Sequence, residues 1–219
     1  MDILKKTLAA LAIILPASAA NAVILTEGNS ELLPGTTVAA EPQLAGTIIE
    51  DEQVNFSFAS GGGGTINGSV QLRVVRSNLD STLDFYWRVF NDAGSSDSIG
   101  SFRIGDFVTG QYNANYRTDG LGDDGPDSAY RFTGALSSYV NFTFDGGLAA
   151  GDSSYFFFLD TDATHYSRTG LFDVTNVTQS HISGSSSMFA PAQVPEPGST
   201  LLLAAGLMGL GLSRKKKHS

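Results

Sequence analysis

The chain of 219 residues contains no cysteine, only three histidines and a single tryptophan. Without cysteine, neither a disulfide framework nor a thiolate metal site can form. The fold must therefore be stabilised by apolar burial alone, and any metal ion would need oxygen or histidine ligands. About 170 residues lie between the two distinctive ends of the chain, which is ample for one hydrophobic core.

Lysine is missing from the whole central region, because the five lysines lie at positions 5, 6, 215, 216 and 217. Between Val23 and Val194, seven arginines stand against 20 acidic residues, which gives a formal charge of −13 compared with −9 for the full chain. A domain of this charge does not neutralise phosphates, so we expect no nucleic-acid partner.

Helical periodicity is scarce between residues 50 and 190, whereas alternation with a period of two recurs. In Leu83–Phe90 one face is entirely apolar, while the other carries Asp84, Tyr86, Arg88 and Phe90. This pattern is typical of a strand with one face in the core. The same logic predicts strands at Val54–Ala59, Ser69–Arg76, Ser98–Phe107, Ala129–Thr133, Tyr139–Asp145, Ser153–Asp160 and Leu171–Val177.

These eight strands, separated by clusters of Gly, Asn, Asp and Ser, predict an all-β fold. We expect an antiparallel two-sheet β-sandwich of jelly-roll or immunoglobulin-like type over residues 23–185. Tyr155–Leu159 is apolar on both faces, which favours a central strand covered on both sides, although an exposed strand of this kind would self-associate. The Ser-, Ala- and Pro-rich residues 186–194 are predicted to be a flexible linker.

The N-terminal residues 1–22 have the pattern of a secretory signal peptide. Two lysines precede a short apolar stretch, and small residues follow at Ala20 and Ala22. The apolar stretch Leu8–Leu15 has eight residues, far fewer than the roughly 20 that a membrane-spanning helix needs. We therefore expect signal peptidase to cleave after Ala22.

One Gly-rich loop concentrates acidic side chains. Its carboxylates belong to Asp119, Asp123, Asp124 and Asp127. Carboxylates on such a loop could wrap a structural Ca²⁺ ion, whose oxygen shell tolerates loose geometry. The spacing does not fit an EF-hand, and the alternative is a solvated turn in which Asp and Gly serve the backbone. No other cofactor is expected.

Catalytic motifs are missing. No Gly-x-Ser-x-Gly elbow places a nucleophile, so we predict that the chain is not an enzyme. A secreted hydrolase would have to use acids of Asp119–Asp127 or of the segment Asp160–His165. A second alternative is a carbohydrate-binding module, in which exposed aromatic side chains stack on sugar rings. Its candidate residues near predicted loops are Tyr112, Tyr116, Tyr130 and Tyr166.

The C-terminal residues 195–217 combine three ordered parts. Pro195, Glu196 and Pro197 form the first; a segment rich in Gly, Ala and Leu follows, and Arg214, Lys215, Lys216 and Lys217 form a basic stop. The uncharged stretch 198–213 would make a short hydrophobic helix of about 24 Å, less than the roughly 30 Å hydrocarbon core. The basic cluster would remain on the cytoplasmic side. This predicts a transient inner-membrane stage better than a lasting anchor.

These three parts, together with the N-terminal signal peptide, resemble the PEP-CTERM sorting signal of Gram-negative bacteria. The resemblance implies processing by exosortase, a membrane protease, near Pro195–Pro197. It also implies export to the cell surface or extracellular matrix of a species that makes exopolysaccharide. We therefore expect a structural or adhesive component associated with exopolysaccharide and biofilm.

Overall fold

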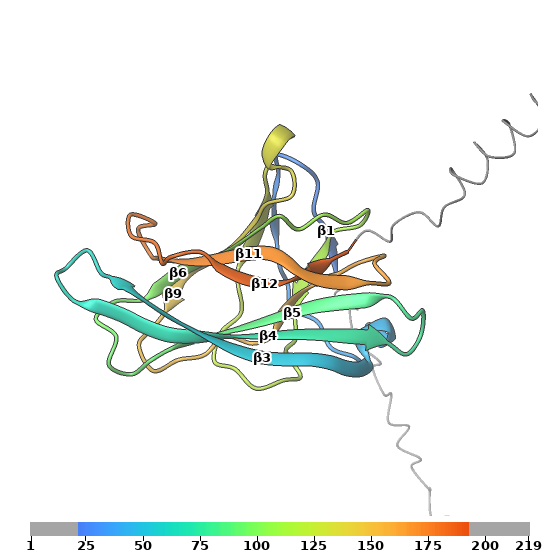
Figure 1. Ribbon diagram of the computed structural model, residues 1–219. Coiled ribbons are helices and arrows are strands. Elements are labelled where there is room, and N and C mark those ends of the chain that lie inside the picture. The colour runs from blue at the N-terminus through green and yellow to red at the C-terminus, as the bar shows by residue number, and fades with distance from the viewer. Residues whose placement is uncertain (1–21, 193–219) are drawn as a thin grey trace, which may run out of the picture.

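The computed structural model describes residues 22–192, which form two six-stranded antiparallel sheets packed face to face (Figure 1). Sheet A has the order β1 (Val23–Ile24), β7 (Asn113–Tyr116), β10 (Phe157–Asp160), β5 (Leu83–Asn91), β4 (Thr65–Ser77) and β3 (Gly46–Ala59). Sheet B has the order β12 (Ser186–Pro191), β11 (Tyr166–Asn176), β6 (Ile99–Gly105), β9 (Val140–Leu148), β8 (Ser128–Arg131) and β2 (Ser30–Leu32).

The predicted all-β sandwich is confirmed. The only helices of the described residues are two short 3₁₀ turns, η1 (Pro42–Leu44) and η2 (Gly134–Leu136). Each of the eight predicted strands corresponds to an observed strand, with ends shifted by several residues in places. Within residues 22–192, no helix is long and apolar enough to span a membrane.

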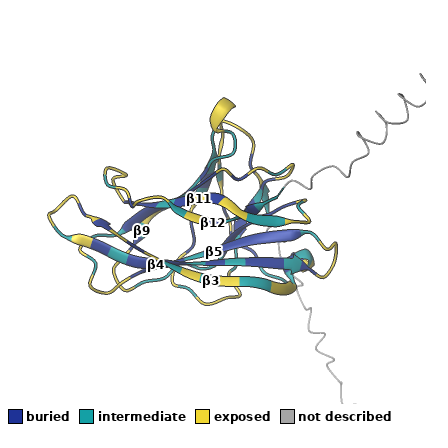
Figure 2. Ribbon diagram, viewed as in Figure 1, coloured by how far each residue is buried: buried dark blue, intermediate teal, exposed yellow. Residues whose placement is uncertain are grey.

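The core lies between the sheets, where strand residues of both layers are buried (Figure 2). Trp87 is at its centre, with ring centroids of Phe102, Phe107, Phe142 and Phe157 at 5.8–6.0 Å. These rings come from both sheets, so the alternation that predicted strand β5 also brings its tryptophan to the sheet interface.

Strand β10 is covered on both faces, as its apolar sequence predicts. Phe157 and Leu159 point into the core, whereas Phe158 points to the outer face of sheet A. There a second apolar cluster forms from Phe158, Tyr86, Leu44 and Val75. This cluster exists because the chain before β3, including η1, folds over the outside of sheet A.

The predicted linker 186–194 is wrong where the structure describes it. Residues Ser186–Pro191 form β12, which pairs with β11 at the edge of sheet B. Met188 and Ala190 are fully buried on its inner side. The sandwich therefore extends beyond residue 185. The strand was not predicted because its composition is rich in Ser, Ala and Pro and only two of its apolar residues enter the core.

Candidate functional site

A groove of about 700 Å³ lies on the outer face of sheet A. Its floor consists of outward side chains of adjacent strands, chiefly Gln71 and Arg73 of β4 and Tyr86 and Arg88 of β5. The strand register places Gln71 opposite Arg88 and Arg73 opposite Tyr86. The volume lies within the range of small-ligand sites.

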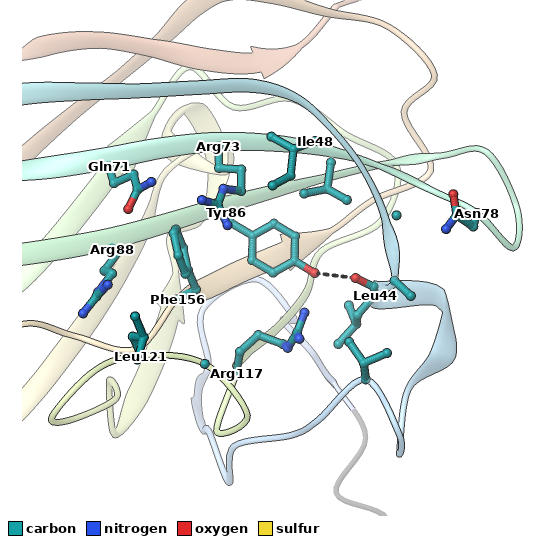
Figure 3. A pocket seen from close by; sticks show the side chains of 15 residues that line it. Leu44, Ile48, Gln71, Arg73, Asn78, Tyr86, Arg88, Arg117, Leu121 and Phe156 are labelled. Carbon is teal, nitrogen blue, oxygen red and sulfur yellow. Dashed lines mark hydrogen bonds between the residues drawn. The ribbon is translucent and has the colours of Figure 1, made fainter.

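Two loops form the wall of the groove, and hydrogen bonds of Asp119 to Val38 and Arg117, called the Asp119 latch below, join them. The Asp119 carboxylate accepts from the backbone N–H of Val38 at 2.9 Å and from Nε of Arg117 at 2.6 Å. Burial alone would raise the pKa of Asp119, but Arg117 and the Val38 N–H together lower it. At the η1 end, the Tyr86 hydroxyl donates to the Leu44 carbonyl at 3.3 Å (Figure 3).

Aromatic and cationic side chains alternate around the groove. Figure 3 shows Arg73, Arg88 and Arg117 arranged around the rings of Tyr86 and Phe156. The Arg73 guanidinium carbon lies 4.4 Å from the Phe156 ring centroid, in cation–π contact. Burial raises the pKa of Tyr86, which therefore stays a neutral phenol. The groove combines apolar rings with fixed hydrogen-bond donors, as binding sites for polar organic ligands do.

A pair of buried carboxyl groups lies on the same outer face of sheet A. Asp84 of β5 and Asp160 of β10 are directly opposite in register and only 1% and 7% exposed. Burial, followed by repulsion from Asp160, raises the pKa of Asp84 to about 9. Burial also raises the pKa of Asp160, to about 6. Asp84 therefore carries a proton at neutral pH and donates it to Asp160.

The four aspartates of the acidic loop do not converge. Asp119 belongs to the latch, and Asp123 accepts from the Ser153 backbone N–H at 2.8 Å. The remaining two accept from other backbone N–H groups: Asp124 from Gly125 and Asp127 from Asp145. Among residues 22–192, no three acidic or histidine side chains gather in a way that could hold a metal ion.

Because each loop carboxylate serves a separate backbone contact, we expect calcium to have no effect on stability. The melting temperature of the full chain should be the same, within about 1 °C, in EDTA and in millimolar Ca²⁺, since only ligands of the native state shift it. Differential scanning calorimetry measures this directly. A melting temperature that is higher in millimolar Ca²⁺ and falls back in EDTA would instead establish the predicted calcium ion.

The acids and the histidine of Asp160–His165 are likewise directed to separate partners. Asp160 contacts Asp84, whereas Asp162 accepts from the Thr109 hydroxyl at 2.8 Å. His165 is exposed and its Nδ1 lies 3.0 Å from the Thr164 hydroxyl. The segment therefore does not bring an acid and a histidine into hydrogen-bonding contact.

The predicted sugar-stacking tyrosines are not in the groove. Tyr112 is buried and donates to the Phe107 carbonyl, and Tyr166 donates to Glu50. The other two are engaged with neighbouring rings, Tyr116 with Tyr155 and Tyr130 with Phe132. Sequence reasoning missed the groove aromatics, although the alternation in Leu83–Phe90 placed Tyr86 and Arg88 together on the outer face.

The predictions for the chain ends fall largely outside the described residues. Residues 1–21 carry all of the predicted signal peptide except Ala22, and residues 193–219 carry Pro195–Pro197, the hydrophobic segment and the basic stop.

Comparison with known families gives one match, the PEP-CTERM protein-sorting motif, over residues 193–215. It includes the Pro-Glu-Pro triplet together with Arg214 and Lys215. No curated protein and no solved structure matches the chain. The chain therefore carries a PEP-CTERM sorting motif, which marks it as an exported protein that exosortase sorts to the cell surface.

Proposed function

We propose that the protein is a non-enzymatic component of the cell surface or extracellular matrix that binds exopolysaccharide through the groove on sheet A. The sorting motif supports the location, because it directs exosortase substrates outward. In this proposal the hydrophobic segment holds the chain in the inner membrane of a Gram-negative cell until processing. Binding of the polysaccharide then gives the protein its adhesive role in a biofilm.

The observation that carries this proposal is the lining of the groove. Two aromatic rings lie beside three guanidinium groups and the Gln71 amide. The half-buried Phe156 ring can cover the apolar face of a sugar, whereas Tyr86 is buried and forms part of the groove floor. The polar side chains can bind the sugar oxygens. The groove is also preorganised, because the Asp119 latch and the strands fix its walls, so that little ordering is needed on binding.

We expect the full chain to be retained by polysaccharide fragments on a glycan array that contains neutral and acidic members. Retention of no member would refute the proposed function. Each retained fragment can then be titrated by isothermal calorimetry, which provides the affinity against which variants are compared.

Substitution Phe156→Ala should weaken binding of a retained fragment by about tenfold or more, since a central aromatic contact is typically worth over 1 kcal/mol. Phe132→Ala is the matched control: Phe132 is half-buried and lines a smaller hollow of about 270 Å³ on sheet B. If Phe132→Ala weakens binding and Phe156→Ala does not, the saccharide binds on the opposite sheet.

A further inference from the structure

The groove concentrates positive charge on a strongly acidic domain. Three of the seven arginines between Val23 and Val194 line it, and none of its lining residues is Asp or Glu. Net charge acts over a distance that salt shortens to about 8 Å under physiological conditions. A ligand inside the groove therefore interacts chiefly with these guanidinium groups and with the carboxylates paired to two of them, and less with acids farther away.

The three arginines differ in how their charge is balanced. Arg73 pairs with Asp51 at 2.8 Å, and Arg117 pairs with Asp119 at 2.6 Å. Among the described residues, no carboxylate lies within ion-pair distance of Arg88. The groove thus contains one guanidinium without a directly paired anion.

Arg88 is nevertheless held in place. Its Nε donates to the Ser154 carbonyl at 3.0 Å and its Nη2 to the Ser153 hydroxyl at 2.8 Å. Its guanidinium carbon also lies 4.7 Å from the Phe90 ring centroid. The side chain is therefore fixed before a ligand arrives, and binding a ligand costs little of its conformational entropy.

The neighbours of Arg88 also favour an anion. Gln71 lies directly opposite Arg88 on β4. Arg73 is the diagonal neighbour of Arg88 in the same register, and their backbone positions are roughly 7–8 Å apart. Burial lowers the pKa of Arg88; Asp123 opposes this, and the like charge of Arg73 adds to it. Because Asp51 already pairs with Arg73, a negative ligand group beside Arg88 would balance the one groove guanidinium that no described carboxylate pairs with directly.

We propose that the groove binds an acidic saccharide, with the carboxylate of a uronic acid residue at Arg88 and Gln71 and its sugar ring against Phe156. This inference rests on the proposed binding of polysaccharide and specifies its chemical class. The Nε and one Nη2 hydrogen of Arg88 are used by Ser154 and Ser153, so a planar carboxylate would accept from the remaining Nη1 and Nη2 hydrogens. The Gln71 amide nitrogen donates one hydrogen to Asp51 at 2.7 Å and has its second hydrogen left for the same carboxylate.

The test is calorimetric titration of the full chain with oligomers of galacturonate, glucuronate and mannuronate. Each is compared with its carboxyl-reduced counterpart, a neutral oligomer of the same shape. At least one acidic oligomer should bind about tenfold more tightly than its neutral counterpart, the effect of one charge-assisted hydrogen-bond pair. Equal binding of the two forms would overturn the carboxylate assignment while leaving the proposed function intact.

Variants locate the carboxylate. Arg88→Gln should weaken binding of the acidic oligomer by about tenfold to a hundredfold and leave the neutral one unchanged. Arg88→Lys keeps the charge but loses the planar fork, so it should give an intermediate loss. Arg103→Gln, on the opposite sheet and paired with Asp173, is the matched control and should change neither affinity.

The outcomes separate the two proposals. Equal losses for acidic and neutral oligomers in Arg88→Gln would mean that Arg88 only supports the groove, which overturns its assignment as the carboxylate site. The circular dichroism spectrum of each variant shows whether the sandwich is intact. Binding of no oligomer overturns the acidic-saccharide inference; if the glycan array also retains nothing, the proposed function fails with it.

Discussion

Replacing Trp87 with alanine should lower the free energy of unfolding by about 3–5 kcal/mol, the usual cost of removing a large aromatic side chain from a core. Trp87 is 2% exposed, and its ring lies within 6.0 Å of aromatic centroids from both sheets. The chain has no cysteine, so no disulfide can compensate. A loss of this size is a large part of the stability of a typical domain, 5–15 kcal/mol.

Urea denaturation followed by far-ultraviolet circular dichroism measures this effect, because the variant lacks the only tryptophan and cannot be followed by its fluorescence. Leu79→Ala is the control: Leu79 is 70% exposed, and its removal should change stability by less than about 0.5 kcal/mol. If the two variants were equally stable, the placement of Trp87 between the sheets would be wrong.

Substitution Asp84→Asn should stabilise the protein at pH 8, by an amount on the order of 1–3 kcal/mol. Both Asp84 carboxylate oxygens are buried, and neither accepts a hydrogen bond from an N–H or O–H group of the described residues. The native state therefore favours the protonated form of this side chain. An asparagine amide donates to Asp160 as the protonated acid does, but needs no proton from solvent.

The pH dependence of stability follows from the same pair. The pKa values of Asp84 and Asp160 in the folded protein, about 9 and about 6, lie above the ordinary value of 3.8. The folded state therefore holds more protons than the unfolded state, so their contribution to stability is complete below pH 3.8 and is lost as pH rises through 6 and 9. Acids with lowered pKa values, such as Asp119, are ionised in both the folded and the unfolded state between pH 6 and pH 9, so they do not change this trend.

Unfolding free energies measured between pH 5 and pH 9 should decline for the natural protein and decline less for Asp84→Asn. Asp145→Asn removes an exposed carboxylate from sheet B and should reproduce the natural profile. A natural profile that rises with pH over this interval, or a variant less stable at pH 8, would contradict a protonated Asp84.

The long strands could be predicted from sequence because alternation survives wherever one face is buried. Leu83–Phe90 gave the position of β5 and the direction of Trp87, and Phe157–Leu159 gave a doubly covered strand. The strands without a predicted counterpart are short, such as β1 and β7, or poor in apolar residues, such as β12. Strands β1 and β7 are held by pairing with strands distant in sequence, whereas β12 pairs with the preceding strand β11. The local sequence pattern records neither kind of pairing.

The groove was harder to predict than the fold. Sequence placed Tyr86 and Arg88 on one face but could not supply the β4–β5 register that brings Arg73 beside them. Nor could it show that the chain around Leu44 folds over that face. The acidic loop was predicted as a possible metal site because its carboxylates are close in sequence. In space, Asp119 fastens the groove wall, and the other three are tied to backbone groups elsewhere.

The position of β12 determines how the domain would carry mechanical load. The strand ends at Pro191, and the sorting motif begins at residue 193, so tension on that segment reaches the edge of sheet B almost directly. A polysaccharide pulling on the groove would load sheet A, and the force would cross the aromatic core between the layers. Strand β12 is six residues long and paired on one side only, so it is the element that we expect to yield first.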